Sequence, residues 1–439
     1  MVALLSAAGL NPEALVFRDV NLLAVTDVHS WLAGGDRESP PGEPPVTHQL
    51  DAGFGDLVSF RERARAAALA QGKDVFLFDN GDVIDGTGLS NTAPDHISHL
   101  LPLLKDVQHD ALTCGNHELY SASTVMALNE SGFARTGSYV TSNLHWTATG
   151  ALLGSPYKVL IGPASGVRLL VFGFMYEMSL AEGRCTSINV SAVHETVRSS
   201  WFVRALHTES ADAIVVLAHM DARDSLLRVI VNGIRAVLPS IPVQIIAGHS
   251  HMRQVEPIDS RAIAFEPGNY FNTIGVASFD LPNRATGLPN RARGSVEGSS
   301  SSAPAAGDDG PTAFHFLDLD TNRQALASVL NLSATAFPTP AGLALDTKIR
   351  ETRVRLGLTR VLGCSSSTFY QGQPLTNLYI KQVLAARHSL LAVCSLHAAR
   401  CTPHAACYPH AGRSVWDVPI TPTHPLRLLD GNPHRGCPR

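Results

Sequence analysis

The chain has 439 residues, of which 45% are hydrophobic, and this length and composition are sufficient for a large folded core. Its formal net charge of −4 excludes the uniformly basic surface that binds nucleic acid through overall charge. No apolar run approaches the ~20 residues of a membrane helix, so the sequence predicts no membrane span.

The first residues, Met1 to Leu10, lack the basic start and long apolar stretch of a secretory signal. The sequence therefore predicts no signal peptide. The compartment stays open between the cytoplasm and, if the N-terminus is incomplete, the vacuole or the exterior. The seven cysteines are irregularly spaced and odd in number, so they do not indicate a disulfide framework.

Apolar runs alternate with segments of helical spacing, and this alternation predicts α/β layers. In the first half, strands are expected at 22–26, 75–78 and 111–114, with helices at 56–70 and 97–104. In the second half, strands are expected at 168–174, 213–217, 243–247, 262–265, 273–281 and 314–319, with helices at 191–208 and 225–237. Segment 36–50 reads as a loop, and the Gly- and Ser-rich segment 282–312 as a flexible insertion.

The C-terminal part of the chain differs in composition from the rest. Residues 400–439 have no lysine and seven prolines, and they lack helical or strand periodicity. We therefore predict a catalytic domain at 1–338, a shorter C-terminal region at 339–399 and a disordered tail at 400–439.

Five short polar motifs each follow a predicted strand. They are Asp27-Val28-His29, Gly81-Asp82-Val83-Ile84-Asp85, Gly115-Asn116-His117-Glu118, Ala218-His219 and Gly248-His249-Ser250-His251. Open α/β sheets place their sites at the carboxyl ends of strands, so we expect the motifs to lie together. Each motif alone is a weak signal, but their carboxylate, amide and imidazole groups are ligands for divalent metals that activate water. Together they predict a two-metal site.

The residue types suggest how two ions would be shared. Asp27 and His29 are close enough in sequence to reach one ion, which His251 completes. Asp82 follows a glycine that permits close backbone approach, and we predict it as the carboxylate shared by both ions. The second ion is then completed by Asn116, His219 and His249.

The motif set resembles the calcineurin-like metallophosphoesterase superfamily. Thr26-Asp27-Val28-His29, Asn80-Gly81-Asp82 and Gly-His-Ser-His most resemble its 5′-nucleotidase branch, including uncharacterised fungal members. Over about residues 20–335, the resemblance implies a β-sandwich flanked by helices. It also implies two divalent ions (Mn, Zn, Fe or Co) and a bridging hydroxide that attacks the phosphorus of a small phosphate ester, such as a nucleotide.

The resemblance also implies roles beyond metal binding. Asn116 and His117 would face the substrate, and His117 would stabilise the transition state or protonate the leaving alkoxide. In many 5′-nucleotidases the motif reads Gly-Asn-His-Glu-Phe-Asp, and the Asp orients the histidine, whereas this chain has Tyr120 there. Asp85 is our candidate for that orienting role, with a solvent contact or a helix cap as the alternative. Arg253 is a candidate phosphate contact, with a surface salt bridge as the alternative.

The resemblance predicts a dinuclear-metal-dependent phosphomonoesterase of 5′-nucleotidase type. The alternatives are a phosphoprotein or phosphodiester phosphatase of the same fold, or an inactive truncated homologue. Residues 339–399 would be a partial 5′-nucleotidase-type C-terminal domain, but they contain no convincing aromatic clamp for a base. Nucleotide specificity therefore comes from the branch rather than from these residues, and the sequence fixes neither the metals nor an oligomeric state.

Overall fold

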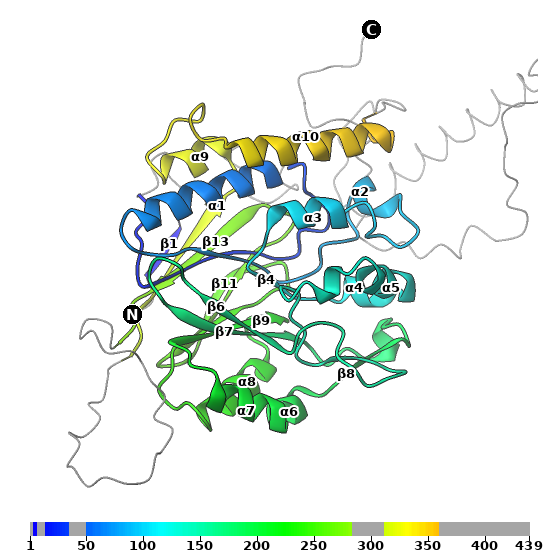
Figure 1. Ribbon diagram of the computed structural model, residues 1–439, viewed down its shortest axis with the longest axis vertical. Coiled ribbons are helices and arrows are strands. Elements are labelled where there is room, and N and C mark those ends of the chain that lie inside the picture. Colours follow the sequence, from blue (N-terminus) through cyan, green and yellow to red (C-terminus); the bar gives the residue numbers. More distant parts are fainter. Residues whose placement is uncertain (1–2, 7–13, 35–49, 283–310, 360–439) are drawn as a thin grey trace, which may run out of the picture. The chain divides into compact units, whose positions relative to one another are not determined.

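Two six-stranded β-sheets form the centre of the structure (Figure 1). This computed structural model describes residues 3–6, 14–34, 50–282 and 311–359. In spatial order, the first sheet contains β1 (Ala3–Ser6), β14 (Phe314–Asp320), β13 (Thr273–Phe279), β2 (Val20–Val25), β3 (Phe76–Asp79) and β4 (Ala111–Leu112). The second contains β11 (Arg253–Asp259), β12 (Ala262–Pro267), β10 (Val243–Ile246), β9 (Ala213–His219), β7 (Arg168–Met175) and β6 (Tyr157–Ile161). A separate pair is formed by β5 (Leu144–Trp146) and β8 (Ile188–Val190).

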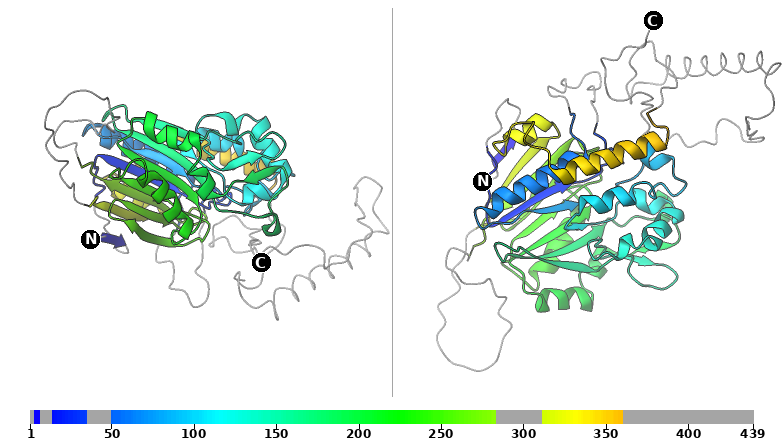
Figure 2. Two further views of the ribbon diagram at one scale, coloured as in Figure 1. Left: turned by 90° about the horizontal axis from the view of Figure 1, so that it is seen from below. Right: turned by 45° about the horizontal axis from the view of Figure 1, so that its top comes forward.

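Helices cover the outer faces of both sheets (Figures 1 and 2). On the first sheet lie α1 (Phe54–Leu69), α3 (Leu101–Val107), α9 (Arg323–Ser328) and α10 (Pro340–Arg355). On the second lie α6 (Val193–Thr196), α7 (Ser200–Thr208) and α8 (Ser225–Arg235). The remaining short helices are α2 (Gly88–Asn91), α4 (His117–Tyr120) and α5 (Ala122–Glu130).

The central strands are apolar throughout because both of their faces are buried. Successive side chains of a strand point to opposite faces. Leu22 accordingly packs between the two sheets, while its neighbour Leu23 packs toward the helices of the first sheet. In the second sheet, Val215 packs between the sheets and Val216 toward α7 and α8. The predicted α/β layers, with a β-sandwich flanked by helices, are confirmed.

Some elements differ from the sequence prediction. The edge strands β6 and β11 were not predicted, because an edge strand keeps polar residues and one open side and so lacks a continuous apolar run. The predicted strand 111–114 contributes only Ala111–Leu112, and the predicted helix 97–104 begins at Leu101. The predicted insertion at 282–312 and the loop at 36–50 lie almost wholly outside the described residues.

Helix α10 lies beyond residue 338 and packs alongside α1 in the same compact unit (Figure 2). Leu345 and Ile349 join the core beneath the helix pair. The described residues of the predicted 339–399 region therefore pack onto the catalytic part of the chain. The rest of that region and the predicted tail at 400–439 lie outside the described residues, so the three-part division stays a prediction.

The helices α1 and α10 meet at a pair of glycines. A Cβ added at Gly342 would lie 2.1 Å from Ser59 Oγ and 2.3 Å from the Gly55 carbonyl oxygen. We therefore expect Gly342→Ala to lower the free energy of unfolding by about 1–3 kcal/mol, the usual cost of overpacking. Urea denaturation measures the change. Leu343→Ala is the control, because Leu343 is 53% exposed on the same helix; equal midpoints for both variants would contradict the close packing.

Candidate active site

The predicted ligands all lie at the carboxyl ends of strands, and both sheets contribute. Asp27 and His29 follow β2, Asp82 follows β3, Asn116 follows β4, His219 ends β9, and His249 and His251 follow β10. Backbone pairing continues past the strand ends, since Asp27 N–H donates to the Gly81 carbonyl and His29 N–H to the Asp82 carbonyl. The first two loops are therefore held together as one layer.

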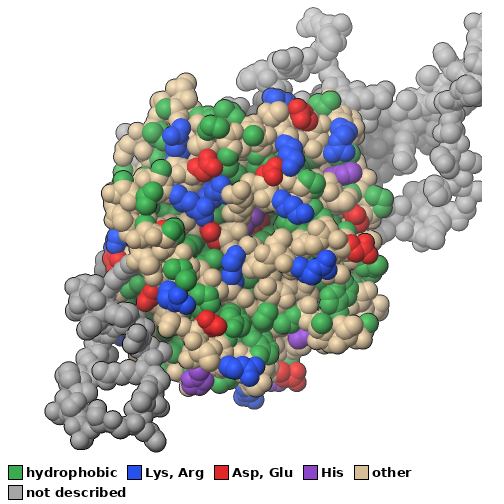
Figure 3. All heavy atoms as spheres, in the orientation of Figure 1, with side chains coloured by type: hydrophobic (Ala, Val, Ile, Leu, Met, Phe, Trp, Pro, Cys, Tyr) green, Lys and Arg blue, Asp and Glu red, His purple; other side chains and the backbone are tan. Residues whose placement is uncertain are grey.

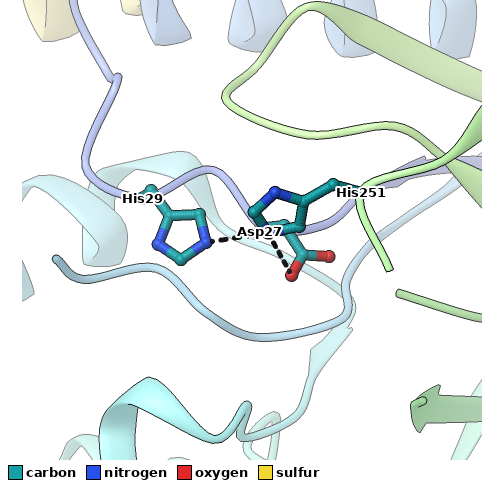
Figure 4. Close-up of side chains that lie close together, drawn as sticks. All are labelled: Asp27, His29 and His251. Carbon is teal, nitrogen blue, oxygen red and sulfur yellow. Dashed lines mark hydrogen bonds and ion pairs between the residues drawn. The ribbon is translucent and has the colours of Figure 1, made fainter. Parts of the chain in front are cut away.

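One group of ligand atoms consists of Asp27, His29 and His251, all within 4.8 Å of one another. Figure 4 shows the His251 ring between the Asp27 carboxylate and the His29 ring. The Nε2 atoms of the two histidines are 3.2 Å apart, and Asp27 Oδ1 lies 3.5 Å from His251 Nε2. Asp27 and His29 are fully buried, so this group is open to solvent only on the His251 side.

A second group consists of Asp82, His219 and His249. Asn116 joins it, because its Oδ1 lies 2.8 Å from His249 Nδ1 and 3.1 Å from His219 Nε2. Asp82 Oδ2 is 3.3 Å from His219 Nε2 and 3.9 Å from His29 Nε2. The carboxylate of Asp82 therefore lies between the two groups.

The histidine tautomers leave bare nitrogens facing other acceptors. His29 Nδ1 is 2.8 Å from the Ile84 carbonyl, and His219 Nδ1 is 2.8 Å from the Asn80 carbonyl, so each Nδ1 carries the proton. When the rings are neutral, each Nε2 then has a lone pair and no proton. The Nε2 of His29 faces His251 Nε2, and the Nε2 of His219 faces the oxygens of Asn116 and Asp82. Such an arrangement is favourable only with a proton or a cation at its centre, and carbonyl-oriented imidazoles are typical of metal ligands. The residues present therefore fit divalent metal ions.

The charges in the site are strongly coupled. Burial lowers the pKa of His219, but the carboxylates of Asp82 and Asp27 have a larger, opposite effect. The net result is a pKa raised to about 10. Burial raises the pKa of Asp82, but the charges of His219 and His117 bring it well below its usual value. Burial also lowers the pKa of His29. The site therefore keeps Asp27 and Asp82 ionised and holds a positive charge on His219 beside them.

Much of the site has left-handed backbone. The φ angles are 50° at Asp27, 44° at His29, 53° at Asp82, 73° at His249 and 62° at His251. Non-glycine residues adopt this conformation at a cost of about 1–3 kcal/mol each, and such residues gather at functional sites. The strain arises because the chain turns sharply at the end of each of these strands, which brings the ligand side chains together.

A buried glutamate braces the first ligand loops. Glu118 accepts hydrogen bonds from the backbone N–H groups of Asp82 (3.0 Å), Val83 (2.8 Å) and Gly115 (2.7 Å). Burial and the charge of Asp82 raise its pKa to about 7. Gly115 is required here, because a Cβ at that position would lie 2.1 Å from Asp82 Oδ1. Sequence analysis noted Glu118 only as a motif letter and gave it no role.

A second buried glutamate, Glu266, holds the loop after β10 by accepting hydrogen bonds from it. Glu266 accepts from Ser250 Oγ (2.7 Å), the Met252 N–H (3.1 Å) and Gln254 Nε2 (2.8 Å). The neighbouring Asn269 places its Nδ2 3.0 Å from His251 Nδ1. Sequence reasoning missed these contacts, because each joins segments whose approach depends on the packing of β11 against β12.

His117 lies beside both groups, and its ring contacts the carboxylate of Asp85. Its Nδ1 is 2.9 Å from Asp85 Oδ2, and its Nε2 is 4.0 Å from Asp82 Oδ2. The other oxygen of Asp85 contacts His96, which sequence analysis did not single out. Burial lowers the pKa of His117, but the carboxylates of Asp82 and Asp85 have a larger, opposite effect. The net result is a pKa raised to about 9.

Arg253 makes its described contacts away from these groups. Its Nη1 pairs with Asp320 at 2.7 Å, and its Nη2 donates to the Asn272 carbonyl at 3.3 Å. Its predicted contact with substrate therefore stays a prediction. On the face shown in Figure 3, basic and acidic side chains are interspersed rather than gathered into a basic patch. Within the described part of the chain, no helix has the length and apolar character to cross a membrane.

Fungal proteins are among the relatives of the chain. An uncharacterised protein of Schizosaccharomyces pombe is 28% identical over 365 residues, which are 82% of this chain and 59% of that protein. A protein of Arthroderma benhamiae, named a secreted protein, is 29% identical over 381 residues, which are 81% of this chain and 55% of that protein. The chain thus spans little more than half the length of these relatives.

Solved structures share the fold. A 5′-nucleotidase from Candida albicans has a TM-score of 0.68 and 27% identity, covering 82% of this chain and 63% of that one. A sulfate thiohydrolase from Thermus thermophilus has a TM-score of 0.52 and 14% identity, covering 78% of this chain and 62% of that one, and so shares the fold alone. The family model for calcineurin-like phosphoesterases matches residues 20–253, more than half of the chain. The chain therefore belongs to the calcineurin-like phosphoesterases.

Proposed function

We propose that the protein hydrolyses small phosphate monoesters of nucleotide type at a centre of two divalent ions. The observation that carries this proposal is the position of Asp82, whose Oδ2 lies within 4 Å of histidines from both ligand groups. The first ion would be held by Asp27, His29, Asp82 and His251, and the second by Asp82, Asn116, His219 and His249. When bound, such ions polarise a phosphoryl oxygen and lower the pKa of water, the chemistry that ester hydrolysis requires.

His117 supplies the proton that the leaving group needs. Its Nδ1–H is held by Asp85, so its Nε2 carries the transferable proton toward the shared carboxylate of Asp82. Although burial lowers the pKa of His117, Asp82 and Asp85 raise it to about 9 in the ion-free site, and the charge of Asp85 favours the protonated ring that a general acid requires. His117 therefore donates this proton to the departing oxygen while Asp85 fixes the ring.

The nucleotide substrate is inferred from a relative. The similar structure from Candida albicans is that of a 5′-nucleotidase, but this chain covers only 63% of its length. The described residues end at 359, within the predicted C-terminal region. The metal site thus supports phosphoester chemistry in general, and AMP-like compounds are the first substrates to test.

A substrate panel tests this proposal. Phosphate release would be measured from AMP, other nucleotides, p-nitrophenyl phosphate, bis-p-nitrophenyl phosphate and a phosphopeptide, with added Mn or Zn. Preference for the nucleotides supports the proposal. Preference for the diester or the phosphopeptide would replace it with the corresponding activity. No release from folded, metal-loaded protein would identify an inactive homologue.

Metal binding should release protons. In the ion-free site, His219 has a raised pKa of about 10 and is protonated at neutral pH, whereas a metal requires its bare Nε2. Because the proton competes with the metal below the raised pKa, Mn affinity should rise by about tenfold per pH unit for each proton displaced. Calorimetric titrations at pH 6, 7 and 8, in two buffers of different ionisation enthalpy, count the protons. An affinity independent of pH would contradict this assignment.

A further inference from the structure

Tyr120 ends α4 and contacts the amide of Asn116 across one helical turn. Asn116 Nδ2 donates to the Tyr120 hydroxyl at 2.7 Å. The other end of the same amide, Oδ1, faces His249 Nδ1 at 2.8 Å and His219 Nε2 at 3.1 Å. We infer that Tyr120 is a positioning residue for the second metal group, acting through Asn116. This inference rests on the proposed two-metal function.

The tyrosine ring is held where this contact needs it. It packs edge-on against the His117 ring, with centroids 4.9 Å apart and planes at 71°. The turn at Gly183 also lies near the ring, because a Cβ added there would be 3.3 Å from Tyr120 Cδ1. The same segment is tied to α4, because the Cys185 N–H donates to the Leu119 carbonyl at 2.8 Å. The ring thus packs against His117 and lies beside this tied segment, although Tyr120 is 41% exposed.

An amide ligand needs this support more than a carboxylate does. Asn116 is neutral, and only one of its two terminal atoms can bind a cation. The χ2 torsion of asparagine is broad, so the side chain does not fix its own amide plane. The hydroxyl of Tyr120 gives the amide a partner at its far end and leaves Oδ1 directed at the second group. Asp85 meanwhile holds His117, so position 120 is not needed to orient that histidine.

Tyr120→Phe tests the inference, because it removes the hydroxyl and keeps the ring. The readout is Mn affinity by calorimetry, in two backgrounds that each disable one group. In the His251→Gln background the second group remains, and we expect Tyr120→Phe to weaken its Mn binding by about tenfold, as for other outer partners of metal ligands. In the His249→Gln background the first group remains, and its affinity should not change.

The outcomes separate this inference from the proposed function. Unchanged affinity in both backgrounds, or equal weakening in both, would overturn the role of Tyr120 in the second group. A wild-type protein that binds fewer than two Mn ions would instead overturn the two-metal proposal itself. Tyr157→Phe is the matched control, because the Tyr157 hydroxyl donates to Glu209 at 3.0 Å, outside both ligand groups, and its loss should leave both Mn affinities unchanged.

Discussion

Asp82→Asn is expected to lower metal-dependent phosphate release by about 1,000-fold or more, since losing about 4 kcal/mol of transition-state stabilisation has this effect. The carboxylate of Asp82 lies between the two ligand groups, 3.3 Å from His219 and 3.9 Å from His29. Its other oxygen, Oδ1, accepts a hydrogen bond from the backbone N–H of His117 at 2.8 Å. An amide has no charge and a single acceptor oxygen, so it cannot serve both groups and hold His117 as well.

Phosphate release from p-nitrophenyl phosphate and bound Mn per chain measure this effect together. Asp106→Asn is the matched control, because the Asp106 carboxylate is 47% exposed and pairs with Lys348 on the surface. The control should retain wild-type activity and two Mn ions. If Asp82→Asn kept activity within about twofold of the wild type, a difference of only about 0.4 kcal/mol, Asp82 would not be the shared ligand.

The edge of the sheets at which the site lies could be predicted from the sequence. Parallel strands end at one edge, so motifs that follow such strands meet there. Asp27, Asp82 and Asn116 follow neighbouring strands of the first sheet, and His219 and His249 follow neighbouring strands of the second. Local apolar runs were enough to locate these strands, because both faces of each strand are buried.

The supporting contacts could not be predicted in the same way. Glu118 and Glu266 are each almost wholly buried and accept several hydrogen bonds from a ligand loop, but the sequence does not show which groups they bind, even though Glu118 stands within a motif. Their partners come from other segments and depend on tertiary packing. His96 likewise reaches Asp85 only through the fold of the segment after α2. The residue types that can bind metals were therefore visible in the sequence, whereas the contacts that orient those residues required the structure.

His117→Asn should discriminate between leaving groups. Loss of a general acid costs about 100- to 10,000-fold when the departing oxygen needs a proton. An alkyl phosphate such as AMP releases a strongly basic alkoxide, so its turnover should fall by this amount. p-Nitrophenolate leaves without protonation, so turnover of p-nitrophenyl phosphate should fall far less. Rates for both substrates, measured at saturating Mn, give the ratio; an equal loss for both would contradict the role of His117 as the acid.

Asp85→Asn should shift the pH dependence of the same reaction. The negative charge of Asp85 helps to raise the pKa of His117 to about 9, and the protonated ring is the active acid. Removing that charge lowers this pKa, so turnover of AMP should begin to decline at a lower pH than in the wild type. Bound ions also lower the pKa of His117, but they do so in both proteins, and the direction of the difference is unchanged. kcat for AMP between pH 6 and 10 measures the shift, with p-nitrophenyl phosphate as the substrate that should not show it. Coincident AMP profiles would mean that Asp85 does not act through His117.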